Sequence, residues 1–527
     1  MKLDTKKTIY VGIAFLIISM FWQVYDTVIA QILINSFGLN QTASGIVMAL
    51  DNVLALFLLP IFGSLSDKTK TKRGRRTPYI FWGTIAAAVL VTGVALFDNA
   101  QVNALNKAGV EPVVTHEMKE TGTYNLVIEE NKQEITITVT YNQDQKRYTY
   151  DSVDKDGNPT VERFLGSKYY SYEGVNYGKK ELAVNKRSED VAIVRNNNIF
   201  LFVGVVGILL FVLIAMATYR TPAVSLMPDV TVKPLRSKAN AIINLMGTAG
   251  GIISLGFLSV LNKQYQSTIP TFACLSVLMI VGLGIFLWKV NEPKLVEEKE
   301  REEKEFGLND VEEKVEEVVE EKDEMPKDVK RSFFLILASI VFWFFGYNAA
   351  TSKFSVYAQN VLGTTFTTPL LVAQAAAVVA FIPIGIIASK IGRRKTILVG
   401  ISILFTAFVL GSLANEETIF LIYLTMGLAG IGWATINVNS YPMVVEMARG
   451  NNVGKYTGYY YSASMFAQIC TPIVSGIIMD LTGTMTVLFP YCAIFVALAF
   501  CTMFFVRHGD SKPIPKKSKL EAFDNDD

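Results

Sequence analysis

Histidine is nearly absent from this chain of 527 residues, which contains only two, His116 and His508. His116 lies in a polar stretch and His508 follows the last apolar run, so no imidazole is expected inside an apolar segment. A proton relay through buried histidine is therefore excluded. If protons move through this protein, carboxylates must carry them.

Cysteine and nucleotide-binding motifs are scarce as well. The four cysteines lie in apolar runs without CxxC spacing, which favours ordinary core positions over redox or metal sites. The sequence has no Walker lysine motif, no HExxH and no GxSxG in a strand–turn–helix context. ATP-driven transport and hydrolase chemistry therefore lack support. We expect no enzymatic activity, no cofactor, no metal site and no nucleic-acid partner.

Charge is sparse and gathered in blocks. Only 18% of the residues are charged, whereas 51% are hydrophobic. The uncharged stretches reach about 20 residues, which lets a helix cross roughly 30 Å of hydrocarbon. The sequence therefore predicts an all-α membrane protein with twelve spans, near residues 8–35, 44–66, 78–97, 197–219, 238–262, 270–290, 332–359, 367–389, 396–414, 417–441, 456–480 and 484–506.

Lysine and arginine are distributed unevenly among the loops. They are abundant before span one, between spans two and three, and after spans four and eight, whereas the short loops 36–43 and 360–366 have none. The positive-inside rule then places both termini in the cytoplasm. We expect a monomeric multi-pass protein of the plasma membrane.

Several short signatures occur twice, at matching positions in two apolar halves. The first pair is Gly63-x3-Asp67-Lys68 with Gly74-Arg75-Arg76, and Gly385-x3-Ser389-Lys390 with Gly392-Arg393-Arg394-Lys395. The second pair is Asp229-x8-Lys238 and Glu446-x8-Lys455. A looser pair is Phe21-Trp22-x2-Tyr25-Asp26 and Phe342-Trp343-x3-Tyr347-Asn348. A duplicated helical bundle with a central site between its halves is typical of secondary transporters.

Two polar stretches interrupt the bundle. Alternating β-branched and aromatic residues in the first predict a small β-rich domain outside the cell, either a decoration or a lid or docking surface. The second is a charged, partly helical tether on the cytoplasmic side. The expected domains are 1–97 with 197–290, the insertion 98–196, the tether 291–331, the second half 332–507 and the tail 508–527.

Polar residues in span one are the first candidates for a transport site, because ionisable groups inside a bilayer are costly. Ser19, Gln23 and Asp26 recur at helical spacing, so they form one stripe that must face the bundle interior. Trp22 and Tyr25 add the aromatic faces that suit a sugar ring, while the carboxylate and amide suit its hydroxyls. The alternative is that a neighbouring helix satisfies Asp26.

Other spans add further polar candidates. Asp51 is the other acid well inside a span, and Lys353 either neutralises a carboxylate or reaches the outer interface. Arg220, just before a proline, marks a gate, a substrate contact or an ordinary helix end. The substrate-binding candidates are Trp22, Gln23, Tyr25, Asp26, Tyr347, Asn348, Trp433 and Asn437, and the coupling candidates are Asp26, Asp51 and Lys353.

The twelve spans, the Gly-x3-Asp-Lys and Gly-Arg-Arg loop with its second-half echo, and the long middle tether resemble the major facilitator superfamily. The stretches DNVLALFLLPIFGSLSDKTKTKRGRRTPYI and TYRTPAVSLMPD resemble its glycoside–pentoside–hexuronide:cation symporters, most closely the sucrose-transporter-like branch. The resemblance covers all but the insertion and the tether, and it implies a bundle of two pseudo-symmetric six-helix halves. The melibiose-type sodium site has two acids in span two where this chain has Ala55 and Leu59, so proton coupling is favoured.

The same resemblance implies a latch on the cytoplasmic side, formed by Asp67, Arg75 and Arg76. Ser389 replaces the corresponding acid in the second half, so the latch is expected to be asymmetric. The gating candidates are Gly63, Asp67, Gly74, Arg75, Arg76, Arg220, Asp229, Lys238, Gly392, Arg393, Arg394, Glu446 and Lys455.

The leading hypothesis is a proton-coupled importer of a sugar or glycoside of disaccharide type, working by alternating access. Its partners would be that small solute, the coupling cation and the lipid bilayer. One alternative is a transporter of another amphipathic solute such as a lysolipid. A second alternative is a membrane sensor whose extracellular domain binds a ligand.

Overall fold

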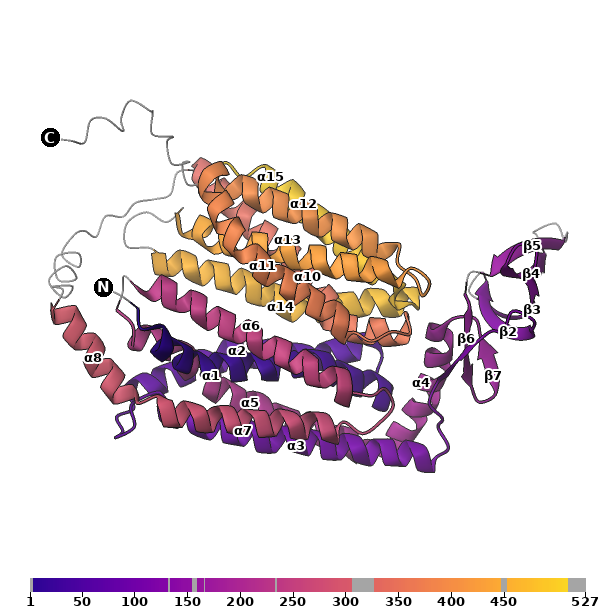
Figure 1. Ribbon diagram of the computed structural model, residues 1–527, viewed down its shortest axis with the longest axis horizontal. Helices are drawn as coiled ribbons and strands as arrows, with labels where there is room; N and C mark the ends of the chain where they lie inside the picture. Colours follow the sequence, from indigo (N-terminus) through magenta and orange to yellow (C-terminus); the bar gives the residue numbers. More distant parts are fainter. Residues whose placement is uncertain are drawn as a thin grey trace.

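The computed structural model describes residues 3–130, 133–153, 159–164, 166–232, 235–305, 327–446 and 453–509. Long helices form two halves that lie side by side (Figure 1). The N-terminal half contains α1 (Thr5–Val24), α2 (Gln41–Lys68), α3 (Thr77–Lys107), α5 (Ile199–Asp229), α6 (Arg236–Leu261) and α7 (Ile269–Lys289). The C-terminal half contains α10 (Lys327–Asn360), α11 (Thr367–Ile391), α12 (Arg393–Ser412), α13 (Ile419–Glu446), α14 (Val453–Thr482) and α15 (Leu488–Phe504).

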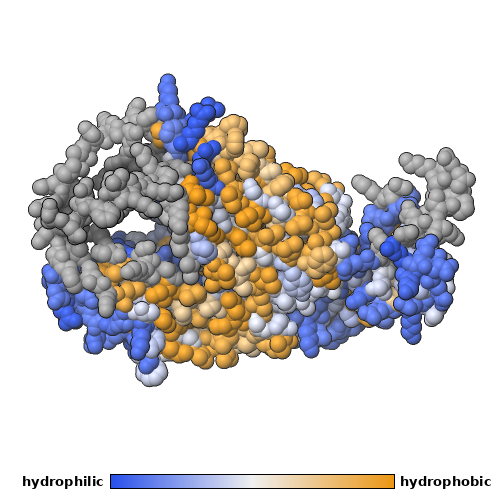
Figure 2. Space-filling view, turned by 45° about the horizontal axis from the view of Figure 1, so that its top comes forward, coloured by the Kyte–Doolittle hydropathy of each residue, from blue (hydrophilic) through white to orange (hydrophobic). Residues whose placement is uncertain are grey.

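An apolar belt surrounds the bundle. Within the described residues, eleven helices are long and apolar enough to cross a membrane, and α11 adds a shorter apolar stretch, Thr367–Phe381. Apolar side chains cover the middle of the visible face and hydrophilic side chains gather at both ends (Figure 2). The prediction of a multi-pass helical bundle is confirmed, with eleven candidate spans among the described residues.

The two ends of the bundle differ, and we name them by what they carry. The insertion end carries the segment between α3 and α5, and the terminus end carries both chain termini and helix α8 (Glu292–Glu305) (Figure 1). The predicted helical character of the tether is confirmed over α8. Residues 306–326 of the tether and 510–527 of the tail lie outside the described residues.

The insertion contains a seven-stranded sheet in the order β1-β6-β7-β2-β3-β4-β5. Its neighbouring strands are antiparallel except for the parallel pair β2 and β7. The strands are β1 (Val114–Glu117), β2 (Thr123–Glu130), β3 (Gln133–Asn142), β4 (Arg147–Val153), β5 (Pro159–Phe164), β6 (Lys168–Tyr172) and β7 (Val175–Tyr177). The predicted β-rich character is therefore confirmed.

The insertion also contains helical parts that the strand-like pattern did not indicate. Helix α3 continues ten residues beyond the predicted end of span three, and helix α4 (Lys180–Asn197) connects the sheet to α5. Buried Leu182, Ala183 and Val184 of α4 pack against the tyrosines of β6 and β7. The sheet is thus attached to the bundle through a helix, not through a loose linker.

Polar contacts between the two halves gather at the insertion end. Asp480 of α14 accepts hydrogen bonds from the backbone N–H groups of Gln41 (3.0 Å) and Thr42 (2.8 Å), at the start of α2. Lys353 of α10 donates to the carbonyl of Gln41 at 2.8 Å. A Cβ on Gly45 would meet the backbone of Pro472, so the glycine permits this close approach of α2 and α14. The structure is therefore closed at the insertion end.

Candidate substrate and coupling site

Two carboxylates and one arginine occupy the interior of the N-terminal half. Asp26 lies in the π-helical turn Tyr25–Ile29 that continues α1, and a π turn widens the backbone where it often serves a functional group. Asp51 comes from α2 and Arg220 from α5, and Arg220 interacts electrostatically with both acids. Among the described residues, no ion pair within 4.0 Å joins them. Arg220 thus interacts with both acids at longer range and forms a close ion pair with neither.

These three groups are reachable by solvent although they lie deep in the bundle. The side chain of Asp26 is exposed, and those of Asp51 and Arg220 are half-buried. One oxygen of Asp51 accepts two hydrogen bonds from Asn52, from its backbone N–H (2.6 Å) and its amide (2.7 Å). Two carboxylates beside one guanidinium leave one negative charge uncompensated, so a bound proton or cation would neutralise the cluster.

Several buried polar atoms near this cluster have no hydrogen-bond partner within the described residues. They come from both halves: Trp22 Nε1, Tyr25 Oη, Asn348 Nδ2 and Gln374 Oε1. Buried polar groups are nearly always satisfied, so this set indicates a place where water or a ligand binds. Donors and acceptors together match the hydroxyl groups of a polar solute.

Both halves also contain aromatic pairs inside the bundle. The rings of Tyr347 (α10) and Trp433 (α13) stack with centroids 3.9 Å apart and planes 4° apart. In the N-terminal half, Arg220 lies 5.5 Å from the ring centre of Trp22, and Trp22 packs edge-on against Tyr25 at 5.3 Å. Ring faces of this kind suit the C–H surface of a sugar.

Sequence reasoning missed Gln374 of α11. Its amide donates to Gln23 Oε1, near the end of α1, at 2.6 Å and so joins the two halves. A lone amide in the apolar run 369–381 was a usable signal, but its partner across the bundle could not be read from the sequence. The predicted Gln23 is therefore placed in a contact between the halves.

Two other residues predicted for the site, Lys353 and Asn437, are not part of the Asp26–Asp51–Arg220 cluster. Lys353 is 2% exposed and donates to Gln41 at the insertion end, and its charge faces Asp480. The structure thus places it in the seam between the halves, and its coupling role stays a prediction. Asn437 of α13 is exposed one helical turn beyond Trp433, and its substrate role also stays a prediction.

The gating candidates of the N-terminal half form a network at the terminus end. Arg76, 4% exposed, pairs with Asp67 and donates to Asp229 at 2.8 Å. Arg75 pairs with the other oxygen of Asp229 at 2.7 Å. Asp67 and Asp229 lie at the ends of α2 and α5, and the two arginines lie in the loop that leads into α3. The network therefore stabilises one half and does not by itself join the two halves.

The duplicated glycine–arginine motif has a partner that the sequence did not reveal. Glu292, at the start of α8 and 1% exposed, accepts hydrogen bonds from the backbone N–H groups of Arg75, Arg76 and Thr77 at 2.8 to 3.1 Å. A Cβ on Gly74, whose φ is +103°, would collide with this carboxylate. The motif therefore binds the beginning of the tether at the N-terminus of α3.

The remaining gating candidates are less informative. A Cβ on Gly63 would lie 3.2 Å from Thr221, which explains a small residue there. Gly392 has a φ of +95° between α11 and α12, and Arg394 donates to the carbonyl of Phe504 at 2.5 Å. Arg393 follows at the start of α12. The side chains of Lys238, Glu446 and Lys455 lie outside those the structure describes.

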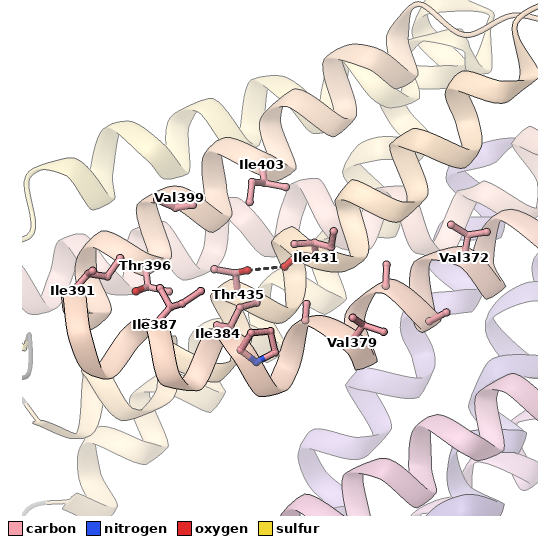
Figure 3. A pocket seen from close by; sticks show the side chains of 14 residues that line it. Val372, Val379, Ile384, Ile387, Ile391, Thr396, Val399, Ile403, Ile431 and Thr435 are labelled. Atoms are coloured by element: carbon pink, nitrogen blue, oxygen red, sulfur yellow. Dashed lines mark hydrogen bonds between the residues drawn. The ribbon is translucent and has the colours of Figure 1, made fainter.

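A large groove lies elsewhere, between α11, α12 and α13 (Figure 3). It has a volume of about 690 Å³ and an almost entirely apolar lining that includes Val379, Ile403 and Ile431. The hydroxyl of Thr435 points to the carbonyl of Ile431 in its own helix, 2.7 Å away. The groove faces the apolar belt and offers no free polar group, so we do not assign the solute site to it.

No group of three or more histidine, cysteine, aspartate or glutamate residues that could hold a metal ion occurs in the described part of the chain.

Comparison with known proteins identifies the family. A model described as Major Facilitator Superfamily matches residues 192–410 and 370–524, and one described as MFS/sugar transport protein matches residues 10–106. No curated protein matches the sequence.

Solved structures share the fold at low identity. A bacterial homologue of the iron transporter ferroportin, in an inward-facing state, has a TM-score of 0.58 and 10% identity over 95% of this chain and 99% of that one. A variant of the nucleoside transporter NupG has a TM-score of 0.56 and 13% identity, over 95% of this chain and 100% of that one. The xylose transporter XylE from E. coli, in an inward-open conformation, has a TM-score of 0.54 and 12% identity, over 96% of each chain. The Major Facilitator Superfamily model matches well over half of this chain. The chain therefore belongs to the major facilitator superfamily of secondary transporters.

Proposed function

We propose that this transporter carries a sugar or glycoside together with a proton. The single observation that carries the proposal is the cluster of Asp26, Asp51 and Arg220 beside unpaired donors and acceptors from both halves. A site between two halves can open to one side of the membrane at a time, as alternating access requires. The match of residues 10–106 to a model described as MFS/sugar transport protein supports the solute class.

The proton-coupling step follows from the charge balance of the cluster. With both carboxylates ionised, Arg220 compensates only one of them. A proton taken up by Asp26 or Asp51 removes the excess charge and frees the guanidinium and the amides to bind hydroxyl groups. Loss of the proton on the other side of the membrane restores the repulsion between the acids and weakens solute binding. Solute and proton therefore bind together.

We also propose the membrane orientation. The arginines and lysines of the loop between α2 and α3 lie at the terminus end, with both chain termini. The positive-inside rule supports a cytoplasmic terminus end and an extracellular insertion end in the plasma membrane. Extracellular protease should then cleave the insertion in intact cells and leave a tag at either terminus untouched.

Counterflow in proteoliposomes tests the solute class without any ion gradient. Vesicles loaded with an unlabelled disaccharide should accumulate the labelled sugar transiently, and monosaccharides, glycosides, nucleosides and lysolipids should be compared with it. The proposal predicts exchange for sugars or glycosides. Exchange of lysolipids alone would show that the solute is a lysolipid and not a sugar. If the folded protein exchanges none of these solutes, the result would favour a membrane sensor.

A further inference from the structure

Helix α4 of the insertion is bound firmly to the N-terminal half. Arg187 donates to the carbonyl of Asn35 at 2.8 Å and to that of Glu111 at 3.0 Å, and its guanidinium lies 4.2 Å from the ring centre of Tyr265. Arg195 donates to the carbonyl of Phe37 at 3.0 Å. These contacts reach the π-helical turn Ile32–Ser36 at the end of the first span and the α6–α7 loop, so we infer that α4 moves with this half.

The other end of α4 contacts the C-terminal half by an exchange of helix caps. Glu416, in the α12–α13 loop, accepts a hydrogen bond from the hydroxyl of Tyr170 at 2.6 Å and interacts electrostatically with Lys180, at the start of α4. In return, Glu181 of α4 accepts from the backbone N–H of Met485 at 2.6 Å and from the hydroxyl of Thr484. Each half thus places a carboxylate at the N-terminus of a helical turn of the other.

A third loop completes this contact. Tyr170 is 1% exposed, and a Cβ on Gly363, in the α10–α11 loop, would lie 2.8 Å from its hydroxyl. Three loops of the C-terminal half therefore meet one short surface of the insertion, formed by Tyr170, Lys180 and Glu181. These are polar, separable contacts at the end of the bundle where the halves must part during alternating access.

We propose that the insertion is a clasp, attached to the N-terminal half by α4, which holds the C-terminal half through the exchanged caps of Glu416 and Glu181. The clasp stabilises the conformation closed at the insertion end, and it must release before that end opens. It acts on the two-half motion of the family and does not depend on which solute or ion is carried. The insertion is then a working part of the transport cycle and not a decoration.

The test measures the separation of the halves directly. Spin labels are placed on cysteines that replace Val260, at the end of α6, and Leu413, at the end of α12, with the native cysteines removed. Both sites are exposed and lie outside the insertion. Pulsed electron paramagnetic resonance of the full chain in nanodiscs, without solute, compares the parent with a Glu181→Ala/Glu416→Ala variant. The matched control is Glu189→Ala/Glu417→Ala, on the same helix and the same loop.

Loss of two caps should raise the ratio of open to closed populations roughly tenfold. The parent and the control should share one short distance, and the cap variant should gain a longer one. Identical distance distributions in all three would overturn the proposal, as would detachment of the insertion with the halves still closed. If the double variant does not fold, Tyr170→Phe should give a smaller shift in the same direction, and no shift there overturns the proposal.

Discussion

The amide of Gln374 in the C-terminal half donates to the amide oxygen of Gln23 in the N-terminal half at 2.6 Å. The oxygen of Gln374 itself is buried and has no partner within the described residues. The two side chains therefore join the halves, and the oxygen of Gln374 remains a buried acceptor beside Gly251 of α6. A solute hydroxyl bound there would contact both halves at once.

Gln374→Ala removes both the bridge and the free acceptor. Loss of one hydrogen bond to the solute should weaken its affinity roughly fivefold to tenfold. Gln374→Glu keeps an acceptor of the same size, so it should retain more affinity than alanine. Counterflow at increasing solute concentration measures this order, and an alanine variant with the affinity of the parent would contradict it.

Arg220 is predicted to be required for transport because it is the cation shared by Asp26 and Asp51. Arg220→Gln leaves two acids without a common partner and should lower the transport rate at least about tenfold. Arg220→Lys keeps the charge and loses the planar fork, so it should be intermediate. The control is Lys289→Gln, whose ammonium lies over the ring of Trp288 at the terminus end. Equal initial rates for Arg220→Gln and the control would contradict this role.

The sequence indicated the architecture well because its signals are local. Apolar length predicts spans, the 3.6-residue period places Gln23 and Asp26 on one face, and the duplicated motifs reveal two halves. Contacts between distant spans carry no such periodicity. The stack of Tyr347 on Trp433 and the bridge of Gln374 to Gln23 depend on how helices pack, so sequence supplied candidates and not pairs. Helix α4 was missed because the neighbouring strand pattern dominated the insertion.

Glu292 should matter for stability although it belongs to the tether. Its buried carboxylate caps the first turn of α3 through three backbone N–H groups. Glu292→Ala should lower the free energy of unfolding by about 1–2 kcal/mol. Glu298→Ala, which removes only the contact with exposed Lys7, should change it by less than about 0.5 kcal/mol. Thermal unfolding in detergent compares the two variants. Equal decreases in stability would show that the Glu292 cap stabilises the protein no more than the exposed ion pair does.

The clasp should respond to pH. Burial raises the pKa of the Glu181 carboxyl above its ordinary 4.5, although Met485, Thr484 and Lys179 oppose the shift. Burial likewise raises the pKa of Glu416, against the hydrogen bond of Tyr170 and the interaction with Lys180. Lys168 also lowers the pKa of Glu416, and Glu129 raises that of Glu181.

The sign follows from comparing the clasped state with a released state in which both carboxyls are solvated. A raised pKa means that the clasped state binds protons more tightly, so its extra stability is full below 4.5. That stability is lost as the pH rises through the raised values. The closed population should therefore grow when the pH falls from 7.5 towards about 4.5. Glu181→Gln/Glu416→Gln mimics the protonated acids and should stay closed at every pH. A closed population that shrinks on acidification would reverse the assignment.

Uptake by proteoliposomes under an imposed pH gradient tests the central claim most directly. The parent protein should accumulate labelled sugar above equilibrium when the inside is alkaline, with or without sodium. Asp26→Asn keeps a hydrogen-bonding amide but cannot take up a proton, so it should lose uphill accumulation and retain at most downhill exchange. Asp51→Asn tests whether the second acid shares this role. A strict sodium requirement in the parent, or an Asp26→Asn variant that still responds fully to the pH gradient, would contradict proton coupling through Asp26.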